Sequence, residues 1–184
     1  EGICAWRALI MKVLICGAGQ VGFGIAERLS TEGNDVTLVD LRADLVQKVN
    51  DTLDARAYVG NGAHPDVLEK AGARDCDMII AVTLHDEINM IAAQVAGTLF
   101  DVPTKIARVR SQTYLTKEWS KLFSRSGMGI DYIISPEREV GEVELAEVGV
   151  ALRRVVARGG RPCRFAVRRL VLEHASGRPA HERT

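Results

Sequence analysis

The sequence has no long hydrophobic run and few cysteines, and each scarcity excludes a class of protein. No apolar stretch approaches the roughly 18 residues that cross a bilayer, so any membrane role has to be peripheral. Neither His64 nor His85 has a second ligand at zinc spacing. The absence of C-x-x-C pairs argues against a disulfide framework or a zinc site and favours structural thiols in a reducing cytoplasm. The cysteines are Cys4, Cys16, Cys76 and Cys163.

Net charge is also lacking, because 24 basic and 24 acidic side chains cancel. The neutral total conceals a split. Residues 151–184 hold nine arginines and two glutamates, a net charge of +7, whereas residues 1–150 hold 15 basic and 22 acidic groups, a net charge of −7. Aromatic residues form only 5% of the chain and Phe165 alone lies among these arginines, so nucleic-acid binding is not expected. The length suits one domain with appendages.

The stretch MKVLICGAGQVG, at residues 11–22, carries the strongest local signal. Its short apolar run favours a β-strand and ends in a G-x-G-x-x-G string, after which the pattern becomes helical. Gly17 allows the turn, Gly19 lets the backbone approach a pyrophosphate, and Gly22 lets the helix pack on the strand. The phosphates would lie at the helix N-terminus, where unpaired N–H groups and the helix dipole favour an anion.

Asp40 closes a second apolar strand at residues 36–39. It follows the glycine string at about the twenty-residue spacing of an acid that accepts hydrogen bonds from the adenosine ribose and disfavours a 2′-phosphate. Arg42 could instead hold a 2′-phosphate, but its position favours the start of the next helix in solvent. The sequence therefore predicts NAD(H) in preference to NADP(H).

The rest of the chain alternates short strands with helices. Further strands are predicted at 55–59, 78–82, 105–109 leading to Arg110, and 131–134. Helices are predicted at 20–31, 44–53, from Pro65 to Gly72, from about 86 through about 99, and from 111 or 112 onward. Six strands with helical crossovers predict an α/β fold, a Rossmann-like doubly wound parallel sheet. Ligands of such sheets bind beyond the carboxyl ends of the strands, where the strand order switches.

Several stretches together resemble the regulatory subunit of Trk-type bacterial potassium uptake, whose modules are the RCK or KTN nucleotide-binding domains. They are MKVLICGAGQVG, VTLVD, GNGAHPDVLEKAGARDCDMIIAVTLHDEINMIAAQVA, KIARVRS and DYIISPE, within residues 11–142. The resemblance implies a cytoplasmic subunit on the inner face of the membrane that binds NAD(H), with ATP or ADP as further candidates. It also implies a homo-oligomer, dimeric or larger, that gates an integral-membrane potassium transporter of the TrkH/TrkG kind.

Carried over residue by residue, the resemblance implies a set of cofactor contacts. Pyrophosphate and ribose fall to Gly17, Ala18, Gly19, Gln20, Val21 and Asp40, the adenine side to Asn61 and Gly62, and the second half of the nucleotide to Thr83, Asp86, Glu87, Arg108 and Arg110. Structural alternatives stay open for some of them. Asp86 could simply cap the long helix, and either arginine could face solvent.

Both ends of the chain fall outside this resemblance. Residues 1–10 lack the basic flank and cleavage site of a signal peptide, and we expect an extension before a natural start at Met11. Residues 143–184 predict a helical or irregular basic tail, with a helix from about 137 to 157 and a loose end. Three explanations of the tail stay open: a shifted reading frame or damaged gene, a dimer or docking helix with a basic arm near the membrane, and, least favoured, nucleic-acid binding.

The alternative function is an NAD(P)-dependent oxidoreductase fragment. A dehydrogenase needs a substrate pocket and a proton donor or acceptor that faces the nicotinamide, normally supplied by a further domain. Only the tail is left over for that purpose, and no Tyr-x-x-x-Lys pair is present, since Tyr114 is followed at four by Glu118. The sequence therefore predicts a regulator and not an enzyme.

Overall fold

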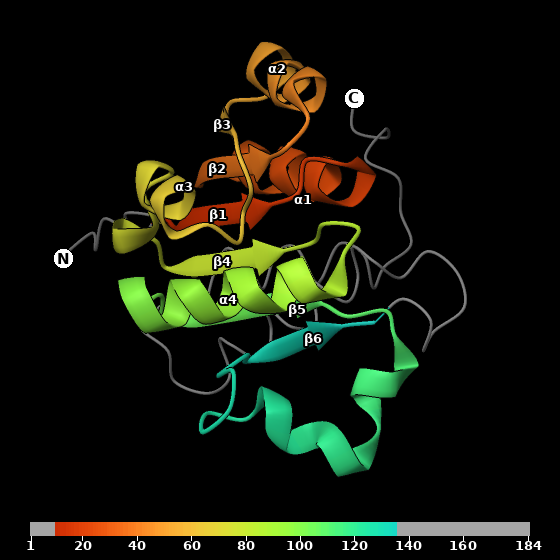
Figure 1. Cartoon of the computed structure of the whole chain (residues 1–184). Helices are drawn as coiled ribbons and strands as arrows, with labels where there is room; N and C mark the ends of the chain where they lie inside the picture. Colours follow the sequence, from red (N-terminus) through yellow and green to blue (C-terminus); the bar gives the residue numbers. More distant parts are fainter. Residues whose placement is uncertain (1–9, 136–184) are drawn as a thin grey trace, which may run out of the picture.

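The computed structural model describes residues 10–135 of the chain (Figure 1). Its strands are β1 Lys12–Cys16, β2 Asp35–Asp40, β3 Arg56–Val59, β4 Met78–Ala81, β5 Thr104–Arg108 and β6 Tyr132–Ile134. Its α-helices are α1 Gln20–Thr31, α2 Ala43–Thr52, α3 Pro65–Lys70 and α4 Asp86–Phe100, and its 3₁₀ helices are η1 Ala73–Asp75, η2 Gln112–Leu115 and η3 Lys117–Phe123. The predicted extension before Met11 (except Ile10) and the predicted tail at 143–184 lie outside the described residues. None of the described helices has the length and apolar character that crossing a bilayer requires.

All six strands run parallel, in the order β3-β2-β1-β4-β5-β6. The chain builds outward from β1 to β3, crosses back to place β4 on the other side of β1, and continues to β6. The strand order therefore switches between β1 and β4, the point where sheets of this kind bind their ligands. The predicted α/β class and the doubly wound six-stranded sheet are confirmed.

Helices cover the sheet on both faces, and β1 shows why its sequence is continuously apolar. Val13 and Ile15 pack with residues of α1 and α2 on one face, whereas Leu14 and Cys16 pack with residues of α3 and α4 on the other. All four side chains are buried. A strand covered on both faces cannot alternate apolar with polar residues, because neither side chain direction reaches water.

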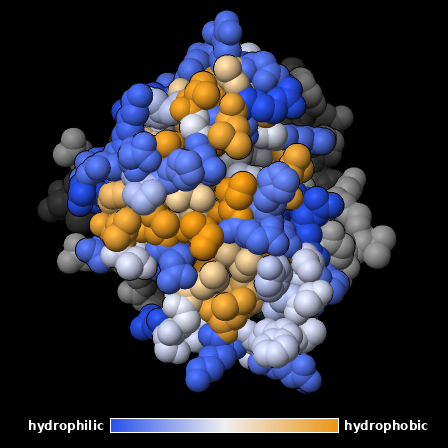
Figure 2. All heavy atoms as spheres, viewed as in Figure 1, coloured by the Kyte–Doolittle hydropathy of each residue, from blue (hydrophilic) through white to orange (hydrophobic). Residues whose placement is uncertain are grey.

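Helix α4 lies across β4 and β5, drawn in green in Figure 1. Its inner face is built from buried small residues, Ala92, Ala93 and Ala96, which let the helix approach the sheet closely. Its outer face keeps Ile91 and Leu99 exposed, at 43% and 51% of their surface. Figure 2 shows hydrophobic residues gathered in a stripe over this helix.

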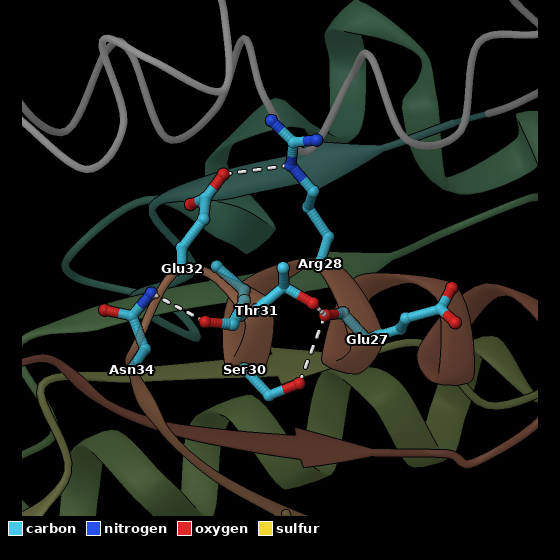
Figure 3. A network of polar contacts seen from close by, with 7 residues as sticks. Glu27, Arg28, Ser30, Thr31, Glu32 and Asn34 are labelled. Carbon is cyan, nitrogen blue, oxygen red and sulfur yellow. Dashed lines mark hydrogen bonds and ion pairs between the residues drawn. The ribbon is translucent and has the colours of Figure 1, made fainter. Parts of the chain in front are cut away.

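Side chains in the last turns of α1 bond within the helix (Figure 3). The hydroxyls of Ser30 and Thr31 both donate to the carbonyl of Glu27, at 3.1 and 2.7 Å. Arg28 and Glu32 form an ion pair of 2.9 Å one helical turn apart. Such local bonds hold the helix up to the point where the chain turns into β2.

The segment after β5 differs from its prediction. Strand β5 ends at Arg108 and does not continue to Arg110, and the single helix predicted from 111 or 112 is wrong, because two short 3₁₀ helices stand in its place. Thr116 separates η2 from η3 in an extended conformation, with φ −69° and ψ 153°, so one α-helix cannot run through it. In η3, Phe123 is buried, whereas Trp119 is 56% exposed.

Candidate functional site

An open cleft of about 530 Å³ lies at the carboxyl edge of the sheet, at the switch point. The ends of β1, β2, β3, β4 and β5 all contribute to its lining. Of the residues predicted as cofactor contacts, those that line the cleft are Gly17, Gly19, Gln20, Val21, Asp40, Asn61, Gly62, Thr83, Arg108 and Arg110. Residues widely separated in the sequence thus converge where the fold class predicts a ligand.

The turn after β1 needs a glycine at its first position. Gly17 has φ +106°, a conformation that side chains with a Cβ rarely adopt. A Cβ there would also lie 2.9 Å from the backbone nitrogen of Thr83. The turn is held on its other side by a hydrogen bond of 2.8 Å from the Gly17 N–H to the carbonyl of Val39. The turn therefore sits tightly between the ends of β2 and β4.

The N-terminus of α1 opens into this cleft. Gly19 is its N-cap residue, and within the described part of the chain no side chain caps the helix and no acid lies in its first turn. A Cβ built on Gly19 would meet nothing within 4 Å. Unsatisfied N–H groups next to open space, at the positive end of a helix dipole, form a place for an anionic group such as a pyrophosphate.

Asp40 borders the same space and is held by two backbone groups. Its Oδ2 accepts a hydrogen bond of 2.6 Å from the Ala18 N–H, and its Oδ1 accepts one of 2.9 Å from the Arg42 N–H. Ala18 itself does not line the cleft; its contribution is to fix the carboxylate. Because each carboxylate oxygen has a second lone pair, Asp40 can still accept from a ribose hydroxyl.

Arg42 is the N-cap residue of α2, which confirms that it starts the next helix. Its guanidinium pairs with Asp44 through two contacts, one of them 3.1 Å from Nε to Oδ1, and both side chains are mostly exposed. This bond raises the pKa of Arg42 and lowers the pKa of Asp44. The cation nearest to Asp40 in sequence is therefore already paired with an acid.

The opposite wall of the cleft carries Thr83, Arg108 and Arg110. Arg108 is the last residue of β5 and is 9% exposed. Arg108 and Arg110 bring two arginines to this wall, and the planar guanidinium suits phosphate recognition.

Asp86 and Glu87, which were also predicted as contacts, do not line the cleft. The N-cap of α4 is His85, so Asp86 is not the cap residue. Its Oδ2 instead accepts hydrogen bonds from the backbone N–H groups of Arg110 and Ser111, at 2.9 and 2.7 Å. Asp86 thereby anchors the chain that follows β5.

Glu87 faces the surface next to η2. The Tyr114 hydroxyl donates to its Oε1 at 3.3 Å. The negative charge of Glu87 raises the pKa of that hydroxyl. Asp86 and Glu87 thus contact the segment after β5 and do not line the cleft.

Apolar residues on the rim of the cleft were not predicted. Leu41 and Leu84 are 63% and 75% exposed and follow the ends of β2 and β4, and His85 and Ile88 line the cleft beside them. The signal that could have identified the leucines is their position, since each directly follows the polar residue that was expected to contact the nucleotide. Exposed leucines at a ligand-binding edge are candidates for contact with a flat apolar group.

Cys16 lies beneath the loop between β3 and α3. Its side chain is completely buried, and its thiol donates a long hydrogen bond of 3.8 Å to the carbonyl of Gly62. Burial raises the pKa of this thiol from 9.0 to about 12. The folded chain therefore keeps Cys16 protonated over a pH range in which the unfolded chain ionises it.

We expect this difference to weaken the fold in alkaline solution. Below pH 9 the Cys16 thiol is neutral in both states, and between pH 9 and 12 only the unfolded state loses the proton, so each pH unit multiplies the unfolding equilibrium constant about tenfold. Urea unfolding from pH 8 to 11 should show a smaller loss of stability for Cys16→Ala than for the wild type. Parallel curves for the two proteins would contradict the assignment. Cys76→Ala should reduce the alkaline loss of stability less than Cys16→Ala does, because burial raises the pKa of the Cys76 thiol only to about 11.

Comparison with known proteins identifies a family that this chain matches. The sequence model of the TrkA-N domain family matches residues 13–136. The Trk system potassium uptake protein TrkA of Azorhizobium caulinodans is 59% identical over 140 residues, which cover 76% of this chain and 31% of that protein. The protein of the same name from Halomonas elongata is 53% identical over 130 residues, 71% of this chain and 28% of that protein. The chain thus spans about a third of the length of these relatives.

Solved structures share the fold at low sequence identity. The TrkA-N domain of the inner membrane protein ybaL from Escherichia coli superposes with a TM-score of 0.61 at 17% identity, over 72% of this chain and 92% of that one. The GsuK channel bound to NAD gives a TM-score of 0.55 at 16% identity, over 70% of this chain and 22% of that one. With the family match over residues 13–136 and more than half of the aligned residues shared with two TrkA proteins, the chain belongs to the TrkA-N domain family.

Proposed function

We propose that this chain is a nucleotide-sensing regulatory domain of a potassium uptake system and that NAD(H) binds in the cleft. The observation that carries the proposal is the uncapped N-terminus of α1, with open space at Gly19 and the Asp40 carboxylate beside it. The names of the TrkA relatives support the potassium system, and NAD in the GsuK channel structure supports the ligand.

The cleft residues suit the adenosine half and the pyrophosphate of NAD. The backbone from Gly17 to Val21 would hold the pyrophosphate at the start of α1, and Asp40 would accept from the ribose hydroxyls. The adenine would lie toward Asn61 and Gly62. Leu41 and Leu84 would then cover its two apolar faces.

The second half of the nucleotide would meet Thr83, Arg108 and Arg110. The same arginines suit the outer phosphates of ATP or ADP, which makes these nucleotides competitors for one cleft. Asp86 would act indirectly, through the backbone of Arg110 and Ser111 that it holds, and Glu87 through Tyr114 of η2. Which nucleotide prevails is then a matter of relative affinity at one site.

The domain would occupy residues 11–142 and work in the cytoplasm, on the inner face of the membrane, as a dimer or larger homo-oligomer. Its partner would be an integral-membrane potassium transporter of the TrkH/TrkG kind. Regulation requires the nucleotide to bind two conformations of the assembly with unequal affinity, because a ligand of equal affinity shifts no equilibrium.

Asp40→Asn is expected to lower NADH affinity by at least about tenfold, since the hydrogen bonds it removes involve a charged acceptor. The amide can offer only one acceptor atom, and its NH₂ group would oppose a backbone N–H that Asp40 now accepts. Isothermal titration of the full chain with NADH, NAD, NADPH and ATP measures the change. Asp44→Asn is the matched control, because Asp44 pairs with Arg42 and does not line the cleft. Equal losses of affinity in both variants would refute the role of Asp40.

Regulation is tested in vesicles that contain the potassium transporter, with the full chain added on the cytoplasmic side. NADH and ATP should change the rate of potassium flux with the wild-type chain, and Asp40→Asn should raise the NADH concentration needed for the same effect at least about tenfold. A rate of potassium flux that neither nucleotide changes would refute the regulatory proposal. Oxidation of NADH by a carbonyl substrate would instead favour the oxidoreductase alternative.

A further inference from the structure

Asn89 lies behind the arginine wall of the cleft and is completely buried. Its Oδ1 accepts from the backbone N–H of Thr83 at 2.8 Å and from the Thr83 hydroxyl at 2.7 Å. Its Nδ2 donates to the carbonyls of Thr83 and Arg108, at 3.2 and 3.0 Å. The side-chain amide of asparagine offers two acceptor lone pairs and two donors, so its whole hydrogen-bonding capacity is used at this site.

These bonds join two strands beyond the end of their own pairing. The parallel register of β4 and β5 has Ala81 opposite Ala107 as its last pair. Asn89, in the first turns of α4, continues the connection past that pair, from the residues after β4 to the last residue of β5. Thr83 and Arg108, the two residues it holds, both line the cleft.

We propose that Asn89 is a positioning residue for the nucleotide site, which fixes Thr83 and Arg108 for the second half of a bound dinucleotide. This inference rests on the proposed function of the cleft. Asp86 extends the arrangement from the same end of α4, because its carboxylate fixes the backbone of Arg110, the next arginine of the wall. Asn89 and Asp86, both near the start of α4, thus set the geometry of the wall although neither side chain lines the cleft.

The inference predicts that loss of Asn89 affects NADH and AMP differently. The adenosine and pyrophosphate side of the cleft is built mainly from the ends of β1, β2 and β3, together with Leu84 after β4. The Asn89 side chain forms none of its hydrogen bonds with these residues. Loss of Asn89 should therefore weaken a ligand that reaches Thr83 and Arg108, such as NADH. AMP, which ends at the first phosphate, should be affected much less.

Titration of the full chain with NADH and with AMP tests the inference, on the wild type, Asn89→Ala, Arg108→Gln and the double variant. We expect Asn89→Ala to weaken NADH binding about tenfold, the effect of one to two lost hydrogen bonds, and to change AMP binding less than about twofold. In the Arg108→Gln background the same substitution should cost less, because Asn89 holds the backbone of residue 108 and that residue then no longer carries a guanidinium.

Asn34→Ala is the matched control. Asn34 is also buried, accepts from the Met11 N–H at 3.3 Å and donates to the Leu29 carbonyl at 3.0 Å, but it lies at the opposite, amino edge of the sheet. Thermal unfolding should show that both variants are destabilised. The titrations should show that only Asn89→Ala lowers the ratio of NADH affinity to AMP affinity. If Asn89→Ala does not fold, Asn89→Asp is titrated in its place, since it keeps both acceptor bonds and loses both donors.

Two outcomes overturn the inference while leaving the proposed function standing. One is an equal loss of NADH and AMP affinity in the Asn89 variants, and the other is a loss that is undiminished in the Arg108→Gln background. The first result would mean that Asn89 only stabilises the fold, and the second that it does not position Arg108 for the ligand. A folded wild-type chain that binds neither NADH nor AMP would instead overturn the proposed function, and the role of Asn89 with it.

Discussion

Replacing Gly19 with aspartate is expected to weaken NADH binding by about a hundredfold or more without destabilising the chain. Two effects act together on the ligand. The carboxylate would enter the space that is open beside Gly19, and its charge would repel the pyrophosphate. It would also accept the N–H groups of the first turn, which the phosphates need. Loss of two charge-assisted hydrogen bonds is enough for a change of this size.

The same substitution suits the fold of the free protein. Gly19 is the N-cap of α1, with φ −65° and ψ −171°, and aspartate is among the preferred residues at that position. No atom lies within 4 Å of the Cβ that aspartate would add. Stability measured by urea unfolding should therefore equal that of the wild type or exceed it by a few tenths of a kcal/mol.

Gly19→Ala separates shape from charge. Alanine adds a methyl group to the same space but no charge and no capping oxygen, so it should weaken NADH binding less than aspartate does. It should lower stability slightly, since alanine is a poor N-cap. Retention of wild-type NADH affinity by Gly19→Asp would show that the nucleotide does not use the N-terminus of α1.

The sheet could be predicted from the sequence because its signals are local. The apolar run before Gly17 and the helical pattern after Gly19 fix β1 and α1 independently of the rest of the chain, and the predicted helix at 20–31 has the observed bounds. Asp40 follows from spacing alone. Most of the predicted contacts therefore lie along one cleft, because parallel strands carry their terminal residues to the same edge.

What the sequence could not show depends on partners that are distant in the chain. In a helical pattern Asn89 is indistinguishable from a surface residue, and only the fold brings it within bonding distance of Arg108, 19 positions away. The same holds for Asp86, whose partners are 24 and 25 positions away. Thr116 likewise breaks a helix that composition alone favours, since its extended conformation is set by the packing of η2 and η3 on the sheet.

Gly22→Ala is the substitution with the largest expected effect on the fold. A Cβ at Gly22 would lie 1.8 Å from the carbonyl oxygen of Gly17 and 2.9 Å from its carbonyl carbon, both backbone atoms of the tight turn after β1. The turn has little room to give way, because even a Cβ on its first residue, Gly17, would lie within 3.0 Å of the backbone of Val82 and Thr83 on its other side. Helix α1 must therefore move off the strand, at an expected cost of about 3 kcal/mol or more.

The sign of this effect distinguishes close packing from helix propensity. Gly22 lies inside α1, where propensity alone would make alanine more stable than glycine by about 0.5 to 1 kcal/mol. Close approach predicts the reverse, a fall in the melting temperature on the order of 10 °C together with loss of NADH binding as the N-terminus of α1 shifts. Gly19→Ala makes the same chemical change three residues earlier, where the added methyl group meets nothing. A Gly22→Ala chain as stable as Gly19→Ala would mean that α1 leaves room for a methyl group beside the turn, and that the third glycine serves no packing role.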